Sequence, residues 1–298
     1  MTAVDHVLLT RFNLPTRGVE GLIRAREGWL QDRVQLFERY CAPSVAAQTT
    51  PICWIVYFDP NSPDWLMERL SPFVADGLFR PVFRSSVDRE HLVADIRRVV
   101  PERGDVLITT NLDNDDGLAV DFSARVSAVA TDHSRAVIYV RRGLIKTADG
   151  VFLRTDSRNA FCSVREGWAE PVTAWSEYHN EFPRVMPSIQ LAGPPGWLQV
   201  IHHANVSNRV RGRLIDPRRH RGRFGDLLDD VAPPGAGRIA VDTLVGLPAR
   251  TVRDGARSAV RAAGLRLLGK DRYQQVKLKV SETTRGMRGG RRLEPEQH

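Results

Sequence analysis

The sequence predicts one α/β domain with a mostly parallel central sheet flanked by helices, followed by a basic helical C-terminal tail. Short apolar runs alternate with helix-length amphipathic stretches through the first half of the chain, the pattern of strands joined by crossover helices. The 298 residues are 42% hydrophobic and 26% charged, which suits one large globular domain with a small appendage. The net charge of +8 is concentrated at the C-terminal end.

Each expected element follows from a local pattern. The expected strands are apolar runs that end in polar residues: residues 4–12, 52–58, 79–83, 106–112, 136–140 and 197–201. The expected helices carry apolar residues at spacings of three and four: residues 29–40, 64–70, 89–99 and 119–131. Pro43 is expected to end the first helix.

The second half of the chain is less regular. Residues 141–196 have few clean periods and many Gly, Pro and Trp residues, residues 216–223 form an expected basic loop, and residues 232–237 form an expected linker. We therefore place a catalytic domain at residues 1–231, and a linker with a basic helical tail at residues 232–298.

Composition limits the class of protein. The three cysteines are scattered and odd in number, which favours a reduced cytoplasmic compartment. The N-terminus has no signal-peptide pattern, and no stretch approaches the ~20 apolar residues of a membrane span. Residues 1–249 contain 30 basic and 30 acidic residues, so the expected catalytic body is neutral. A nucleic-acid enzyme more often carries its positive charge on the body that grips the phosphates, so no nucleic-acid partner is expected.

The strongest chemical signal is the acidic block Asp113-Asn114-Asp115-Asp116. It follows an apolar strand directly, at the sheet edge where α/β proteins bind ligands. Crowded carboxylates repel one another unless a cation lies among them, and Mn²⁺ or Mg²⁺ held by carboxylates and substrate phosphates would supply that charge. The alternative is a solvated turn that caps the next helix.

The ordered set of motifs resembles a bacterial family, the putative rhamnosyltransferases, which are GT-A-type glycosyltransferases. The resemblance covers about residues 4–215 and rests on the acidic block and four further pieces: residues 6–13, 43–48, 54–59 and 197–205. It implies a GT-A-like domain that transfers a sugar, with rhamnose suggested by the family name. One position departs from the family pattern, because Asn111 stands where a basic residue is expected before Leu112.

The resemblance also implies roles for individual residues. Asp113 would contact the donor sugar or ribose and take part in catalysis, while Asp113, Asp115 and Asp116 would hold the metal. Asn114 belongs to the same donor-binding turn. The first two strand ends would bind the nucleotide through four residues: Thr10, Arg11, Asn13 and Asp59. A surface ion pair for Arg11 and a turn cap for Asp59 remain alternatives.

A histidine that follows the late strand is expected to complete the metal site. GT-A enzymes often return such a residue to the metal, and neutral imidazole is a competent ligand. His202 is the candidate and His203 its rival, because adjacent strand residues face opposite ways. The residues that follow would cover the diphosphate, as arginine forks suit phosphate: Asn205, Arg209 and Arg211.

A carboxylate that accepts the proton of the acceptor hydroxyl group is the least constrained part of the expected site. Glu166 lies in the middle region where GT-A enzymes place this base, and a structural ion pair is its alternative. Glu177 and His179 are further candidates. Trp168 and Trp175 either stack on the acceptor sugar or belong to the core.

The tail suggests where the acceptor lies. Residues 250–298 contain 13 basic and 5 acidic residues, with an apolar helical stripe flanked by arginines, which is typical of a helix on anionic lipid. We therefore expect a glycan or glycolipid acceptor and peripheral contact with the inner face of the membrane. A packed helix with a disordered end is the alternative to this contact. For the whole chain, a nucleotidyltransferase and a non-catalytic binding protein are the alternative functions.

Overall fold

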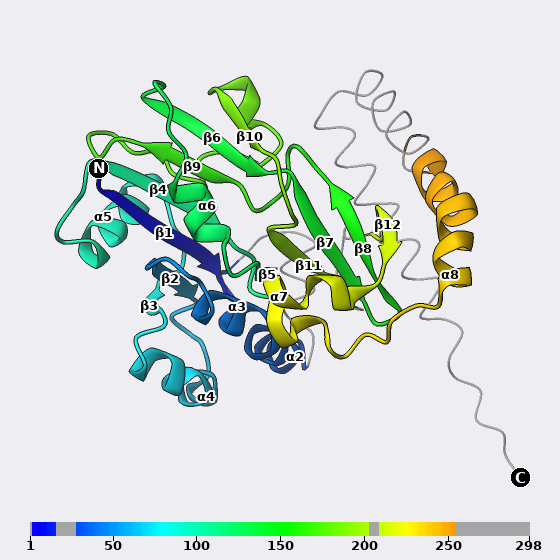
Figure 1. The fold of residues 1–298 in the computed structure, drawn as a ribbon. Helices are drawn as coiled ribbons and strands as arrows, with labels where there is room; N and C mark the ends of the chain where they lie inside the picture. The colour runs from blue at the N-terminus through cyan, green and yellow to red at the C-terminus, as the bar shows by residue number, and fades with distance from the viewer. Residues whose placement is uncertain (1, 16–27, 203–208, 254, 256–298) are drawn as a thin grey trace, which may run out of the picture. The chain divides into compact units, whose positions relative to one another are not determined.

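The protein is described by a computed structural model over residues 2–15, 28–202, 209–253 and 255. The chain divides into two compact units, Met1–Thr243 and Leu244–His298. The first unit contains two β-sheets with helices around them (Figure 1). The predicted α/β class is confirmed.

The larger sheet has seven strands in the order β10-β6-β9-β4-β1-β2-β3. Four of its six strand pairs are parallel, whereas β9 is antiparallel to both β4 and β6. The predicted mostly parallel sheet is therefore confirmed. Its strands are β1 (Val4–Arg11), β2 (Cys53–Phe58), β3 (Arg80–Phe83), β4 (Val106–Asn111), β6 (Arg135–Val140), β9 (Ser163–Glu166) and β10 (Ser188–Leu191).

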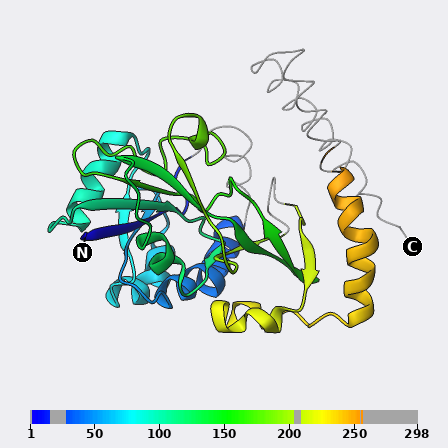
Figure 2. The same ribbon diagram turned by 45° about the horizontal axis from the view of Figure 1, so that its top comes forward.

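A second sheet of five strands was not predicted. Its order is β12-β8-β7-β11-β5, and only β11 and β7 form a parallel pair. The hairpin of β7 and β8 follows β6 directly and extends away from it (Figures 1 and 2). Its strands are β5 (Gly117–Leu118), β7 (Arg142–Thr147), β8 (Gly150–Thr155), β11 (Trp197–Val200) and β12 (Arg213–Ile215). Strand β5 begins directly after the acidic block, so this block joins the two sheets.

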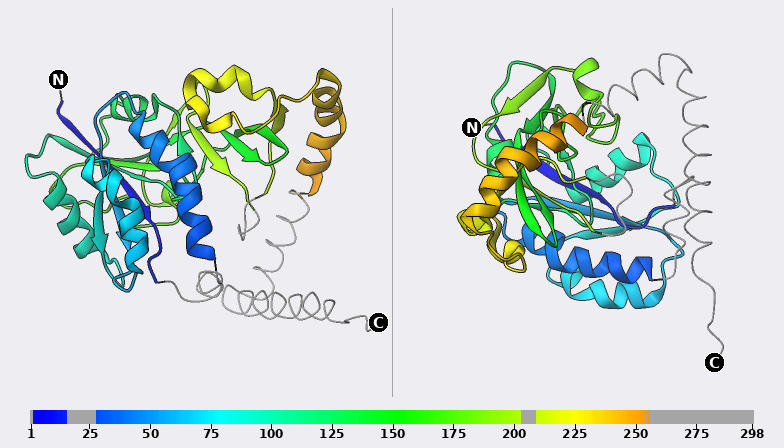
Figure 3. Two further views of the ribbon diagram at one scale, coloured as in Figure 1. Left: turned by 90° about the horizontal axis from the view of Figure 1, so that it is seen from below. Right: turned by 90° about the vertical axis from the view of Figure 1, so that its right-hand side faces the viewer.

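Helices cover both faces of the larger sheet, as the alternation along β1 requires. Leu8 packs in a cluster with Phe37 and Phe122, whereas Val7 and Leu9 pack on the opposite face. The first face carries α2 (Trp29–Leu36), α4 (Asp64–Ala75) and α6 (Phe122–Ser127), and the second carries α5 (Arg89–Val99). Figure 3 shows α2 and α4 on the same side of the sheet.

The first helix does not end at Pro43. It continues from α2 through a π-helical turn, η1 (Phe37–Cys41), into α3 (Ala42–Ala46). Pro43 lies in the first turn of α3, where a missing backbone N–H costs little. The predicted helix 119–131 is also shorter than expected, since only α6 forms there.

The segment after β12 folds onto the second sheet. The expected loop 216–223 is largely helical, as η3 (Pro217–His220) and α7 (Arg221–Phe224), and η4 (Gly225–Leu228) follows. Arg238 in α8 (Ala236–Val241) donates to the carbonyl oxygen of Asp149 at 2.8 Å, and Asp242 accepts from the backbone N–H of Leu214 at 2.9 Å. The first unit therefore continues beyond the expected boundary at residue 231, through the start of η5 (Asp242–Gly246).

In the second unit, residues 247–253 are helical. The rest of the expected basic tail, residues 256–298, lies outside the described residues. Among the helices that the structure describes, none is both long and apolar enough to cross a membrane.

Candidate functional site

The acidic block forms a tight turn between β4 and β5, at the carboxyl end of the parallel strands. The backbone N–H of Asp116 donates to the carbonyl oxygen of Asp113 at 3.2 Å. Asp115 and Asp116 are buried, whereas the Asp113 side chain is exposed to a neighbouring pocket. The turn therefore holds two carboxylates inside the protein and presents one outside.

Asp115 binds two partners from other parts of the chain. Its Oδ2 atom lies 2.5 Å from Nη1 of Arg33 in α2 and 2.9 Å from Nε2 of His202, just after β11. Burial alone would raise the pKa of Asp115, but the hydrogen bond to His202 and the charge of Arg33 outweigh burial and lower it. Asp115 is therefore held as a carboxylate. The structure brings together Asp115 and His202, two of the residues expected to hold a metal.

Asp116 connects the acidic turn to strand β11. Its Oδ1 accepts a hydrogen bond from the backbone N–H of Val200 at 2.8 Å, which fixes the end of β11 beside the turn. Burial, followed by the charges of Asp115 and Asp113, raises the pKa of Asp116 well above its usual value. The protein around the Asp113 carboxylate and the charge of Asp115 also raise the pKa of Asp113. Additional positive charge near the turn would stabilise both carboxylates.

The side chain of Asn114 connects the turn to the end of β1. Its Nδ2 donates to the carbonyl oxygens of Phe12 at 2.7 Å and Arg11 at 3.3 Å, and its Oδ1 accepts from Arg33 at 3.2 Å. This buried amide group makes protein contacts at both ends. The geometry thus gives Asn114 a structural role in place of the expected contact with the donor.

Three of the residues expected to bind the nucleotide also make structural bonds. Thr10 is fully buried, donates to the carbonyl oxygen of Leu112 at 2.8 Å and accepts from Trp54 at 2.9 Å. Asn13 accepts from the backbone N–H of Asp59 at 3.0 Å and so ties β1 to the turn after β2. The Asp59 carboxylate accepts from the N–H of Asn61 at 2.8 Å, which is the turn-cap alternative.

Arg11 is the member of this group that reaches the pocket. Its guanidinium carbon lies 4.2 Å from the centre of the Trp175 ring, and the Trp175 indole N–H donates to Asn111 at 2.8 Å. The Arg11 charge also acts to lower the pKa of Asp113. Arg11 thus places a cation beside the acidic turn, stacked on an aromatic face.

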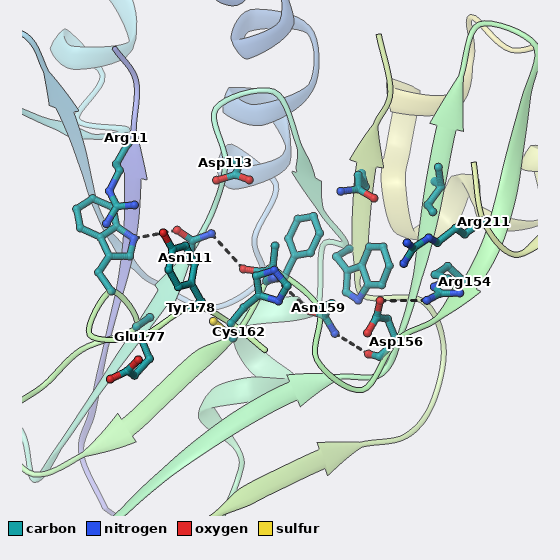
Figure 4. A pocket seen from close by; sticks show the side chains of 18 of the residues that line it. Arg11, Asn111, Asp113, Arg154, Asp156, Asn159, Cys162, Glu177, Tyr178 and Arg211 are labelled. Atoms are coloured by element: carbon teal, nitrogen blue, oxygen red, sulfur yellow. Dashed lines mark hydrogen bonds and ion pairs between the residues drawn. The ribbon is translucent and has the colours of Figure 1, made fainter. Parts of the chain in front are cut away.

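The pocket has a volume of about 760 Å³ and runs from Asp113 across the face of the second sheet. Figure 4 shows Arg11 and Glu177 at one end, and Arg154, Asp156 and Arg211 at the other. Aromatic side chains contribute to its wall: Phe161, Trp175, Tyr178 and Trp197. This volume lies within the usual range for small-molecule sites.

The structure corrects the role expected for Glu166. Strand β9 runs antiparallel to β4 and pairs Glu166 with Leu107, so Glu166 lies ~13 Å along the strand from Asn111. Its buried carboxylate accepts from Arg135 Nε at 2.8 Å and from the N–H groups of Val172 and Thr173 at 2.9 and 2.8 Å. Glu166 is therefore part of the framework, which is the structural alternative noted above.

The two other candidates for the base, Glu177 and His179, both line the pocket. His179 Nδ1 lies 2.5 Å from the carbonyl oxygen of Arg158. Within the described part of the chain, the Glu177 side chain has no hydrogen-bond or ion-pair partner, and it is exposed. Glu177 is therefore available to a bound molecule.

The structure describes part of the loop that follows β11. Arg209 and Arg211 line the pocket, whereas His203 and Asn205 lie outside the described residues. Sequence reasoning missed the site residues Arg33, Arg154 and Asp156. Arg33 lies in a helix predicted for its apolar face alone, and the other two lie in the region without clean periods.

The residues present fit a divalent cation in one respect. An octahedral ion holds its ligand atoms at ~2.1 Å, so two ligand atoms at right angles to each other are about 3 Å apart. The Asp115 Oδ2 and His202 Nε2 atoms are 2.9 Å apart. Among the described residues, however, no three His, Cys, Asp or Glu side chains gather closely enough to hold a metal without other ligands. Further oxygen atoms from a bound diphosphate would be needed.

Comparison with known proteins yields one family. A sequence model of the family described as "Putative rhamnosyl transferase" matches residues 5–214. No curated protein matches the chain.

Several solved structures are similar at low identity. S. aureus TarS 1-349 in complex with UDP is 9% identical over 66% of this chain and 60% of that chain, with a TM-score of 0.40. GalNAc-T7 with UDP, GalNAc and Mn²⁺ is 11% identical over 66% of this chain and 44% of that chain, with a TM-score of 0.38. The inositol-1-phosphate CTP transferase from T. maritima is 10% identical over 78% of this chain and 100% of that chain, with a TM-score of 0.36. Scores this low carry no argument about function, and the match spans only about 60% of the TarS fragment.

Proposed function

Because this chain belongs to the putative rhamnosyl transferase family, we propose that it moves a sugar, with rhamnose as the first candidate, from a nucleotide-diphosphate donor to a glycan or glycolipid. The observation that carries this proposal is the pair of Asp115 and His202, one after β4 and one after β11, with their ligand atoms 2.9 Å apart. Sugar transfer from such a donor releases a diphosphate, whose charge must be neutralised beside the reacting bond.

We propose that Mn²⁺ or Mg²⁺ binds with the donor between Asp115, His202 and the diphosphate. When bound, the ion neutralises negative charge on the leaving diphosphate. His202 must present a neutral Nε2 atom to the ion and so give up its present hydrogen bond to Asp115. Asp116 holds β11 in place through Val200.

The remaining roles follow from the pocket. Asp113 faces the pocket beside Arg11 and is placed to bind hydroxyl groups of the donor sugar or ribose. Arg11 is placed to bind the phosphates. We assign to Glu177 the removal of the proton from the acceptor hydroxyl group, because its carboxylate is exposed in the same pocket.

We further propose a cytoplasmic enzyme that contacts the inner face of the membrane through its tail, where a glycolipid acceptor would lie. Apolar side chains of the second unit support this, since Leu244, Val245 and Val252 are 77%, 63% and 72% exposed. The catalytic body balances to zero charge, so no nucleic-acid partner is proposed.

A nucleotide-sugar screen tests the function. Full-length protein is heated with UDP-, GDP-, CDP- and dTDP-sugars, with and without Mn²⁺, and donor hydrolysis is followed in parallel. One donor class should raise the melting temperature only with metal, because a ligand of the folded state stabilises it. Release of pyrophosphate from a nucleoside triphosphate and a sugar phosphate would indicate a nucleotidyltransferase. Binding without any turnover would indicate a non-catalytic binding protein.

A further inference from the structure

The end of the pocket opposite Arg11 carries a second group of charges. Arg154, Arg211 and Asp156 lie at this end (Figure 4), and Arg209 lines the same pocket. The Arg154 Nη2 atom lies 3.3 Å from Asp156 Oδ2, and both side chains are about 30% exposed. Two guanidinium groups and one carboxylate therefore lie together at this end of the pocket.

Strand register places Arg154 far from the metal-binding pair. Arg154 on β8 is opposite Gly143 on β7, and Trp197 of β11 lies over Gly143, where an added Cβ would be 1.9 Å from the indole ring. His202 follows β11, five residues beyond Trp197, and β11 lies two positions from β8 in the sheet. Its separation from Arg154 is thus ~10 Å across the sheet and ~16 Å along it.

A glycine lets the chain after Arg211 approach the backbone at Arg154 closely. Gly212 has φ +85°, and a Cβ there would lie 2.2 Å from the carbonyl oxygen of Leu153 and 3.2 Å from the Cα atom of Arg154. Only glycine fits so close an approach at positive φ. The chain thereby runs close beside β8 as it enters β12, and Arg211 lies in the pocket near Arg154.

These observations suggest what this end of the pocket binds. The planar fork of arginine matches carboxylate and phosphate groups in particular. A diphosphate held at Asp115 and His202 does not extend over the distance estimated above, so the anion belongs to another part of the substrates.

We propose that the acceptor is an acidic glycan, and that Arg154 and Arg211 bind a carboxylate or phosphate group on it. This inference rests on the proposed function, since it names the second substrate of the same pocket. It replaces the expected contact of Arg211 with the donor diphosphate. The acidic group is bound at the far end of the pocket, so the attacking hydroxyl group lies on a sugar nearer to Asp113.

Ligand-observed NMR with the full-length protein tests this proposal. The probes are methyl β-glucuronide and glucose 6-phosphate, with methyl β-glucoside as the neutral control, each with and without Mn²⁺ and pyrophosphate. The two acidic sugars should bind at least ten times more tightly than the glucoside, and pyrophosphate should not displace them. R154Q and R211Q should each weaken the acidic sugars about tenfold, and R154K should weaken them less.

R158Q is the matched control, because Arg158 is exposed shortly after β8 and is not among the residues that line the pocket. It should leave the binding of the acidic sugars unchanged, and the melting temperature of every variant checks its folding. Equal binding of acidic and neutral sugars, or no binding of the acidic sugars, would overturn the proposal. Displacement by pyrophosphate would assign the arginines to the donor site and also overturn it. Failure of Mn²⁺ and pyrophosphate to bind would count against the proposed metal site alone.

Discussion

Arg33 Nη1 lies 2.5 Å from Asp115 Oδ2, so an arginine from α2 forms an ion pair with the carboxylate expected to bind the metal. The same guanidinium group donates to Asn114 and lies 5.2 Å from the centre of the Trp29 ring. The family resemblance predicts a basic residue near this turn, and Asn111 stands in its place. In the structure, the positive charge beside the turn comes from Arg33 of α2.

Arg33→Met is expected to bind Mn²⁺ about tenfold more tightly than the wild-type protein when no nucleotide is present. A partly buried ion pair contributes on the order of 1 kcal/mol, which the metal must overcome to reach Asp115. Electron paramagnetic resonance of free Mn²⁺ measures the affinity. Arg39→Met is the control, since Arg39 is more exposed and lies 4.0 Å from Asp230. Equal Mn²⁺ affinity of the wild-type protein, Arg33→Met and Arg39→Met would show that Arg33 and the metal do not compete for Asp115.

His202→Ala is expected to weaken metal-dependent binding of a nucleoside diphosphate by at least about tenfold, since losses even in the outer shell of a metal site reach that size. His203→Ala is expected to have a smaller effect, because the assignment rests on the contact of His202 with Asp115. Calorimetry with and without Mn²⁺ measures both. The assignment fails if His203→Ala has the larger effect.

Glu166→Gln is expected to lower stability, whereas Glu177→Gln is expected to lower sugar transfer. Glutamine keeps one acceptor oxygen and places an NH2 donor where the other carboxylate oxygen was, so it cannot accept from Arg135, Val172 and Thr173 together. This change and the loss of the buried charge opposite Arg135 should lower the free energy of unfolding by about 3 kcal/mol. Glu177→Gln changes an exposed side chain and should alter stability by less than about 0.5 kcal/mol. It should lower sugar transfer by about 100-fold. Urea denaturation and transfer assays separate the two effects, and full transfer by Glu177→Gln would remove it as the base.

Stability is expected to fall between pH 7 and pH 5 because of His6. Burial lowers the pKa of His6 to about 4, and its ring nitrogens lie 2.8 Å from Thr110 Oγ1 and 3.1 Å from Ser127 Oγ. The unfolded state takes up a proton near pH 6.5 and the folded state only near pH 4, so stability is present above pH 6.5 and is lost as the pH falls. The loss by pH 5 is about 2 kcal/mol.

His6→Gln should reduce this pH dependence, as measured by urea denaturation at pH 7 and pH 5. His91→Gln is the control, because His91 is exposed and paired with Asp88. An unchanged slope in His6→Gln would mean that another group titrates.

The tail is expected to bring the protein to anionic membranes. Basic residues near an anionic surface contribute about 1 kcal/mol each, and salt weakens that contribution. Full-length protein should sediment with phosphatidylglycerol vesicles at low salt, and protein truncated after Ala249 should not. The truncated protein should keep its metal and donor binding, because those residues lie upstream. Equal sedimentation of both would show that the tail does not direct the protein to lipid.

The sequence alone determined the parallel half of the fold and the location of the acidic turn. Apolar periodicity is a local property, so it identified β1, β2, β4 and α5, and the carboxyl ends of parallel strands meet at one sheet edge. A polar residue after a buried strand is also visible in the sequence, and the family resemblance made His202 a candidate there with His203 as its rival.

The tertiary structure decided which side chains meet. Antiparallel pairing of β9 with β4 carries Glu166 away from the acidic turn, and no local pattern encodes that direction. Packing of α2 against the turn selects Arg33 as the partner of Asp115. The second sheet forms from short strands between turns, where glycines such as Gly212 allow close approach of the backbone. Contacts between distant segments depend on strand direction and packing, and apolar periodicity reports neither.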